Sequence, residues 1–247
     1  MGTLIVTGAS RGIGAAVALA AADAGYAVAV NYVREETAAQ RVVAQIRERG
    51  GKACGIGADI SREPDIIRLF QRAEQELGPI RALVNNAGIT GGFARVDETK
   101  AEMLEQLMAI NVIGPMLCAR EAVKRMSTRF GNSGGAIVNI TSLAARTGGS
   151  GEWVHYAATK GAMNSFTIGL AREVADEKIR VNAVSPGLID TDIHSAAGEP
   201  DRLQRLSPTI PMKRAGTPEE IAAGVVWLLS PGASYVTGTI LEIGGGR

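Results

Sequence analysis

Short apolar runs alternate with longer amphipathic stretches along the whole chain, and this alternation strongly constrains the fold. The runs of strand length lie at residues 3–7, 26–30, 52–57, 81–84, 135–140, 179–184 and 238–243. The stretches of helical length lie at 13–24, 35–49, 63–76, 101–127, 153–176 and 217–229. Strands that are apolar throughout and alternate with helices are typical of a parallel sheet covered on both faces. Since the crossovers of such a sheet are right-handed, we predict one doubly wound α/β domain over residues 1–247, with about seven strands.

The composition excludes several classes of protein. Apolar residues make up 46% and charged residues 21%, which is typical of a chain that folds around a core. Lys and Arg number 26 against 25 Asp and Glu, without a long run of either sign, so the chain lacks the basic footprint of a nucleic-acid-binding protein. The Ala-rich stretch at 12–24 contains Asp23 and follows Arg11, and no basic leader precedes the first strand. We therefore expect no membrane segment and a cytoplasmic protein.

The few cysteines and histidines indicate no metal site. Cys54 and Cys118 lie far apart in the sequence and form no metal or redox motif, so we expect both to be small buried hydrophobes. The two histidines, His155 and His194, cannot form a zinc site with so few cysteines.

A glycine-rich segment, Thr7-Gly-Ala-Ser-Arg-Gly-Ile-Gly14, joins the first predicted strand to the first predicted helix. We expect Gly8 to permit a tight turn, Gly12 to let the backbone approach a pyrophosphate, and Gly14 to let the helix pack closely on the sheet. The free N–H groups at the start of the helix would face the phosphates. An ordinary strand-to-helix turn is the alternative, but the flanking strand, the helix and the second strand at 26–30 favour a dinucleotide site.

The end of the second predicted strand indicates which dinucleotide binds. A ribose 2′-OH is usually bound there by Asp or Glu, about 20 residues past the glycine loop. This chain instead has Asn31, Tyr32 and Val33, followed by Arg34. Because Arg34 and Arg11 offer two cations that would attract a 2′-phosphate, we predict NADP(H) in preference to NAD(H). NAD(H) is the alternative if both arginines are solvated surface charges.

Tyr156 and Lys160 form a candidate acid/base pair. Four residues apart on a helix, they share one face. A phenol has an unperturbed pKa of about 10, and an adjacent ammonium favours the phenolate, so we expect Lys160 to lower the pKa of Tyr156. His155 should point away from this face and is interpreted as a packing or interface residue.

The chain resembles the short-chain dehydrogenases/reductases, which are Rossmann-fold oxidoreductases, over essentially its whole length. The motifs that carry the resemblance are Thr7-Gly-x-x-x-Gly-x-Gly14, Asp59, Asn85-Asn-Ala-Gly88, Asn111, Ser142, Tyr156-x-x-x-Lys160 and Pro186-Gly187. Reductases of 3-oxoacyl carrier-protein thioesters and glucose 1-dehydrogenases are the most similar in character, and the motifs do not separate them. The resemblance implies hydride transfer between NADP(H) and a small-molecule carbonyl or secondary alcohol, and a homotetramer.

The resemblance also implies roles for single residues. Ser142 would bind the substrate oxygen, Tyr156 would exchange its proton, and Lys160 would hold the nicotinamide ribose. Asn111 would interrupt the helical tract at 101–127 and free a carbonyl that holds a water. The residues expected to bind the cofactor are Gly8, Ser10, Arg11, Gly12, Ile13, Gly14, Asn31, Arg34, Asp59, Ile60, Asn86, Ala87, Gly88, Tyr156, Lys160, Pro186, Gly187, Ile189 and Thr191.

Within this set, the resemblance places Asp59 and Ile60 beside the adenine and residues 86–88 along the adenine side of the groove. The residues Pro186, Gly187, Ile189 and Thr191 would border the nicotinamide.

Several assignments have plainer alternatives. The Asn85-Asn86 pair could form a simple turn, Asn111 could be a tolerated mid-helix amide, and Ser142 could be a cap, with Thr141 able to serve in its place. At the level of function, the alternatives are a non-catalytic dinucleotide-binding regulatory protein, or an epimerase or dehydratase that uses the same residues.

The longest irregular segment spans about 185–216 and follows the carboxyl end of a strand, where ligands of such sheets bind. Together with residues 148–151, it is expected to shape the substrate pocket. The side chains Leu188, Ile189, Ile193, Leu203 and Leu206 indicate an apolar-leaning pocket. His194 is a further candidate for contact with the substrate.

Overall fold

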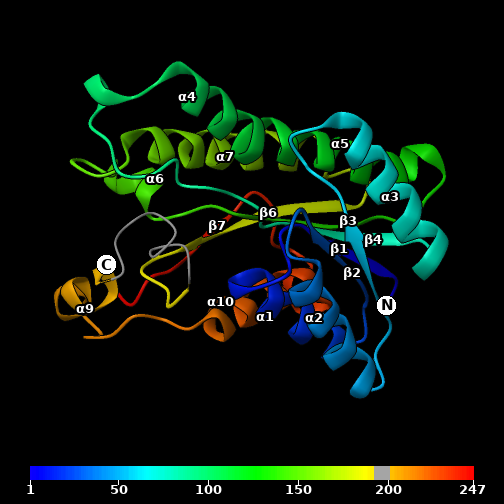
Figure 1. The fold of residues 1–247 in the computed structure, drawn as a ribbon. Coiled ribbons are helices and arrows are strands. Elements are labelled where there is room, and N and C mark those ends of the chain that lie inside the picture. The colour runs from blue at the N-terminus through cyan, green and yellow to red at the C-terminus, as the bar shows by residue number, and fades with distance from the viewer. Residues whose placement is uncertain (192–200) are drawn as a thin grey trace.

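Seven parallel strands form a single sheet in the computed structural model, which describes residues 1–191 and 201–247. Their order across the sheet is β3-β2-β1-β4-β5-β6-β7 (Figure 1). The strands are β1 (Thr3–Val6), β2 (Ala27–Tyr32), β3 (Ala53–Gly57), β4 (Ile80–Asn85), β5 (Gly135–Ile140), β6 (Ile179–Pro186) and β7 (Ile240–Ile243). The predicted doubly wound parallel sheet is therefore confirmed. Ile193 and His194, which were expected near the substrate, lie outside the described residues.

Helices cover both faces of the sheet (Figure 1). One face carries α1 (Gly12–Asp23), α2 (Glu36–Glu48) and α10 (Pro218–Leu229). The other face carries α3 (Glu63–Leu77), α4 (Ala101–Met108), α5 (Gly114–Met126) and α7 (Val154–Glu173). The shorter elements are η1 (Val96–Glu98), the π turn η2 (Ala109–Ile113), η3 (Thr128–Phe130), α6 (Ala144–Thr147), α9 (Arg202–Leu206), η4 (Ser207–Thr209) and η5 (Pro231–Ala233).

The strands contribute side chains to two hydrophobic cores, because successive side chains point to opposite faces of the sheet. Leu4 and Val6 of β1 pack in the core beneath α1, α2 and α10. Ile5, which lies between them, packs in the core beneath α3, α5 and α7. Since β1 is buried on both faces, it needs the continuous apolar run from which it was predicted.

The sheet reverses its winding between β1 and β4. The chain first builds outward from β1 to β2 and β3, then crosses back and continues from β4 on the other side of β1. The strands that leave a switch point of this kind open a crevice at their carboxyl ends, where doubly wound proteins bind ligands. This crevice contains the turn after β1 and residues 86–88 after β4.

The predicted helical tract at 101–127 is broken into α4, the π turn η2 and α5. Gly114 N–H donates to the carbonyl of Ala109, five residues earlier. A side chain at Gly114 would collide with the carbonyl oxygen of Ile60, so the wider turn also needs a glycine for close packing. Asn111 lies in the middle of this turn, as the expected interruption of the helix requires.

Cys54 and Cys118 are both buried and free, as predicted. Across residues 1–191 and 201–247, no helix combines the length and the apolar character that a membrane span requires.

Candidate active site

The glycine loop forms a tight turn directly between β1 and α1. Gly8 and Gly12 adopt φ values of +62° and +54°, a region in which side chains other than glycine are strained. A side chain at Gly14 would collide with the Gly8 carbonyl and lie 2.5 Å from Asn86 Nδ2. Gly14 therefore allows close packing as expected, although it packs against the loop and Asn86 rather than against the sheet.

The side chains of two asparagines support this loop through hydrogen bonds to its backbone. Asn86 Nδ2 donates to the carbonyls of Thr7 and Gly8, at 2.9 and 3.0 Å, so Asn86 ties the end of β4 to the loop. Asn31 Oδ1 accepts from Gly8 N–H at 3.2 Å, and its Nδ2 donates to the carbonyl of Ala58 at 3.0 Å. Since Asn31 is only 1% exposed, its side chain supports the loop and cannot make the direct cofactor contact expected of it.

The start of α1 is open to an anion. Its N-cap residue, Arg11, makes no side-chain capping bond, so the first N–H groups of the helix remain free to donate hydrogen bonds. Gly8, Ser10, Arg11 and Gly12 line one cavity together with residues 86–92. A Cβ on Gly12 would lie 3.5 Å from Thr191, which lines the same cavity, so the glycine leaves space between them. Glycines and helix N-termini of this kind can cradle a diphosphate.

Arg11 and Arg34 are exposed, and neither forms an ion pair with a carboxylate in the described part of the chain. Arg34, Asp59 and Ile60 do not line either of the two cavities at the switch point. Asp59 Oδ1 accepts from both the backbone N–H and the hydroxyl of Ser61, at 2.9 and 2.7 Å, so part of this carboxylate fixes the turn before α3.

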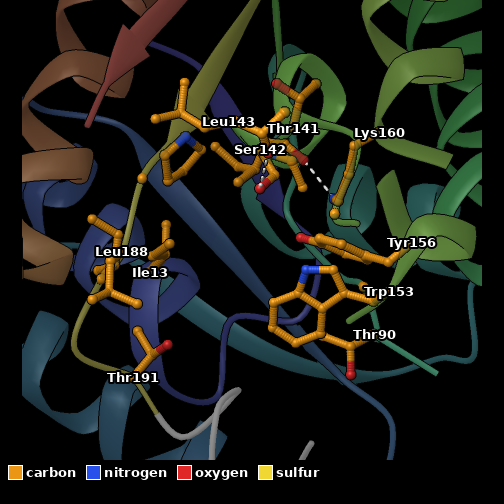
Figure 2. Close-up of a pocket in the computed structure, with 18 of the residues that line it drawn as sticks. Ile13, Thr90, Thr141, Ser142, Leu143, Trp153, Tyr156, Lys160, Leu188 and Thr191 are labelled. Atoms are coloured by element: carbon orange, nitrogen blue, oxygen red, sulfur yellow. Dashed lines mark hydrogen bonds between the residues drawn. The ribbon is translucent and has the colours of Figure 1, made fainter. Parts of the chain in front are cut away.

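Ser142, Tyr156 and Lys160 come together in a second, adjoining cavity (Figure 2). Ser142 follows β5, while Tyr156 and Lys160 lie one turn apart on α7. Lys160 Nζ lies 5.5 Å from the centre of the Tyr156 ring and donates to the carbonyl of Ile140 at 2.8 Å. The two cavities share Asn86, Gly88, Thr90 and Thr191. The glycine loop and the Ser–Tyr–Lys group therefore border one continuous groove.

The ionisation of the Tyr–Lys pair differs from the expectation. Burial raises the pKa of Tyr156 to about 12, although a hydrogen bond from Ser142 opposes the shift. Burial also lowers the pKa of Lys160 to about 8. Burial is the main cause of the raised pKa of Tyr156, and Lys160 is not among its causes, so the expected lowering by Lys160 is not seen at this phenol.

Ser142 and Thr141 are distinguished by their hydrogen bonds. Thr141 is buried, and its hydroxyl donates to the carbonyl of Val184 in the neighbouring strand. Ser142 Oγ accepts from Ala144 N–H at 3.1 Å and also bonds Tyr156. Ser142 thus caps the turn that begins α6, as its plainer alternative proposed, and it also faces the tyrosine.

Asn111 connects three parts of the site. Its amide bonds both the N–H and the carbonyl of Ile89, at 2.9 and 2.8 Å, and donates to Thr159 on α7 at 3.1 Å. A Cβ on Gly88 would lie 3.2 Å from Asn111 Oδ1 and 3.6 Å from Lys160 Nζ. Gly88, which follows β4, therefore lies where Asn111 of the π turn and Lys160 of α7 approach each other.

The segment after β6 completes the groove. Pro186, Gly187, Ile189 and Thr191 all line the cavity that contains Tyr156. A Cβ on Gly187 would lie 2.7 Å from Gly244, so this turn also requires a glycine.

His155 is buried, and its Nε2 lies 3.1 Å from the Gly92 carbonyl. It therefore packs against the loop that contains Gly92, which is one of the two roles predicted for it.

Sequence reasoning missed the wall formed by Phe93, Glu152, Trp153 and Arg202, most of which lines the cavity beside Tyr156. One signal was available for Trp153. It is one of only two tryptophans in a chain with 4% aromatic residues, and it precedes Tyr156 by three positions. That spacing places it on the same side of a helix start. Of the apolar residues expected here, Leu188 and Ile189 line the cavity, whereas Leu203 and Leu206 do not.

Comparison with known proteins places this geometry in a family. The family described as Enoyl-(Acyl carrier protein) reductase matches residues 8–247. The chain is 50% identical over 247 residues to the uncharacterized oxidoreductase YgfF of Escherichia coli K12, and the match covers 100% of both chains.

Two solved structures are similar over nearly the whole chain. A short-chain type dehydrogenase/reductase from Mycobacterium marinum is 35% identical with a TM-score of 0.92, covering 99% of this chain and 94% of the other. A blue fluorescent protein from a metagenomic library, in complex with NADPH, is 34% identical with a TM-score of 0.91, covering 99% and 97%.

Proposed function

The chain belongs to the short-chain dehydrogenase/reductase family of oxidoreductases, and from that premise we propose that it uses NADP(H) to interconvert a carbonyl compound and a secondary alcohol. The observation that carries the proposal is the single groove that joins the glycine loop to Ser142, Tyr156 and Lys160. A dinucleotide at the loop and a carbonyl group at the tyrosine would then be neighbours.

The residues of the groove fit a phosphorylated dinucleotide. The diphosphate would lie at the uncapped start of α1, against Gly12 and Ser10. A 2′-phosphate would find Arg11 and Arg34, whose guanidinium groups have no carboxylate partner among the described residues. The structural relative that contains NADPH supports the phosphorylated cofactor. Asn31 and Asn86 contribute by holding the loop in shape.

When bound, the nicotinamide donates or accepts the hydride, and this chemistry belongs to the cofactor. The protein must bind the substrate oxygen and move a proton. The Ser142 hydroxyl binds the carbonyl oxygen, and the Tyr156 hydroxyl delivers the proton to it. Because burial raises the pKa of Tyr156 to about 12, the side chain is a phenol at neutral pH, which suits the reducing direction.

Lys160 and Asn111 have supporting parts in this proposal. The Lys160 amine is within reach of both the Ile140 carbonyl and the groove, where it would bind the ribose hydroxyls of the nicotinamide half. With a pKa of about 8, Lys160 exchanges its proton readily close to neutral pH. Asn111 holds the backbone at Ile89 and the helix turn that carries the lysine, and a water at the π turn would relay protons to Lys160.

The test is a screen of aldehydes and ketones, with loss of NADPH absorbance as the measurement and NADH in parallel. The proposal predicts turnover with NADPH and a lower kcat/KM with NADH. Tight NADPH binding without turnover of any carbonyl would favour a regulatory dinucleotide-binding protein. Conversion of a substrate without net consumption of NADPH would favour an epimerase or a dehydratase.

A further inference from the structure

Three side chains contact one another in the cavity wall beside Tyr156. The rings of Phe93 and Trp153 are stacked, with centroids 4.7 Å apart and planes 29° apart. The guanidinium carbon of Arg202 lies 4.5 Å from the Trp153 ring and 5.4 Å from the Phe93 ring. The Trp153 ring lies 5.6 Å from that of Tyr156. The wall therefore reaches the proposed proton donor directly.

These distances show how the indole of Trp153 is held. If Phe93 and Arg202 sandwiched the indole, they would be separated by nearly the sum of their distances to it, well above the 5.4 Å observed. They therefore support the same side of the ring. Trp153 also lines the cavity. Figure 2 shows it beside Tyr156, across the cavity from Ile13 and Leu188.

A partly buried ion pair fixes the wall in place. Arg202 donates two hydrogen bonds of 2.6 Å to the carboxylate of Glu152, the residue before Trp153. Arg202 is only 3% exposed, and its guanidinium holds the pKa of the Glu152 carboxyl below its usual value. Such a fork fixes orientation as well as distance. The charges of Arg202 and Glu152 offset each other within the wall, while Arg247 lines the same cavity.

We propose that Trp153 determines substrate specificity: its indole binds a flat, unsaturated or aromatic group attached to the reacting carbonyl, and the Glu152–Arg202 pair positions the indole for this contact. The proposal rests on the proposed function, since it takes Tyr156 as the group that meets the carbonyl oxygen. With the two rings 5.6 Å apart, a substituent on that carbonyl lies over the indole. A flat ring keeps contact across its whole face, whereas a puckered ring does not.

The matched pair of benzaldehyde and cyclohexanecarbaldehyde tests this directly. We expect Trp153→Leu to lower the ratio of their kcat/KM values, aromatic over saturated, by roughly threefold to tenfold relative to the wild type. The change in the ratio between proteins removes the difference in intrinsic reactivity of the two aldehydes. Trp153→Phe should keep most of the preference. Trp227→Phe, a control at an exposed position of α10, should leave the ratio unchanged. An unchanged ratio in Trp153→Leu would overturn the proposal.

A binding measurement separates this inference from the proposed function. In the Trp227→Phe background, Trp153 is the sole tryptophan. Benzyl alcohol should change its emission at a concentration at least roughly threefold below that needed for cyclohexylmethanol. Such selectivity without turnover of any carbonyl would refute the proposed reaction and leave the role of Trp153 standing. Equal concentration dependence for the two alcohols would refute the role of Trp153.

The positioning role of the ion pair has its own readout. In the same background, Arg202→Met should lower the anisotropy of Trp153 emission and raise the KM for benzaldehyde more than it lowers kcat. Arg202→Lys keeps the charge but not the fork, so it should restore only part of the anisotropy. Glu152→Gln tests the pair with a smaller change of shape. Wild-type anisotropy in both Arg202→Met and Glu152→Gln would overturn the positioning role.

Discussion

Replacement of Lys160 by methionine is expected to stabilise the protein while it removes activity. Burial lowers the pKa of Lys160 from 10.5 to about 8. At about 1.36 kcal/mol for each pKa unit, the charged lysine costs the folded state about 3 kcal/mol below pH 8. Loss of the hydrogen bond to the Ile140 carbonyl offsets about 1 kcal/mol of this gain. The free energy of unfolding of Lys160→Met should therefore exceed that of the wild type by about 2 kcal/mol at pH 7.

The pH dependence gives the prediction a distinct signature. Between about pH 8 and pH 10.5 the unfolded chain keeps a proton on Lys160 that the folded protein has lost. The stability of the wild type therefore rises with pH in this window, whereas Lys160→Met lacks this contribution, and the gap between them should close. Tyr156, whose pKa is raised to about 12, contributes stability that is lost only above about pH 10.

Urea denaturation of both proteins at several pH values between 7 and 10 measures the gap. Unchanged denaturant slopes would show that the two unfolding transitions are comparable. A Lys160→Met variant that is less stable than the wild type at pH 7, or a gap that stays constant to pH 10, would refute the reasoning from burial. The same variant should have little turnover, because it lacks the amine proposed to hold the nicotinamide ribose. A functional residue is often retained in this way at a cost in stability.

Three further results follow from the structure. Arg34→Glu should weaken NADPH binding by roughly tenfold to a hundredfold and leave NADH binding little changed. The control Arg129→Glu, at the far end of the sheet, should alter neither Kd, and equal losses for both cofactors would contradict a 2′-phosphate contact. Gly14→Ala should lower the melting temperature and weaken NADPH binding, because its Cβ meets the Gly8 carbonyl and Asn86, whereas Gly169→Ala on α7 meets no atom within 4 Å and should not destabilise the protein. Burial raises the pKa of the Cys118 thiol to about 12, so a thiol reagent at pH 8 should label it only as the chain unfolds, and rapid labelling of the native protein would contradict its burial.

The sequence was informative where one local property decides the structure. Runs of consecutive apolar residues marked β1, β2 and β4, because a strand buried on both faces is mostly apolar. Glycines marked the loop between β1 and α1, where Gly8 and Gly12 need positive φ. Both signals depend on residues close together in the chain, so they can be recognised in a single sequence.

Other features depended on contacts between distant segments. The direction of the Asn31 side chain is set by the carbonyls of Ile56 in β3 and Ala58 just after it, so its position at the end of β2 did not show that it is buried. The pKa of Tyr156 is dominated by burial, which the spacing to Lys160 does not report. Arg202 meets Glu152 across 50 residues of chain, so no local pattern indicated the wall that holds Trp153.

Tyr156→Phe tests the central claim most directly, because it removes one oxygen and keeps the ring that packs against Trp153 and Lys160. The measurement is kcat for reduction of the best carbonyl substrate, together with the Kd for NADPH. If Tyr156 delivers the proton, kcat should fall at least roughly a hundredfold while the Kd changes little. A variant that binds NADPH normally and turns over near the wild-type rate would contradict the account.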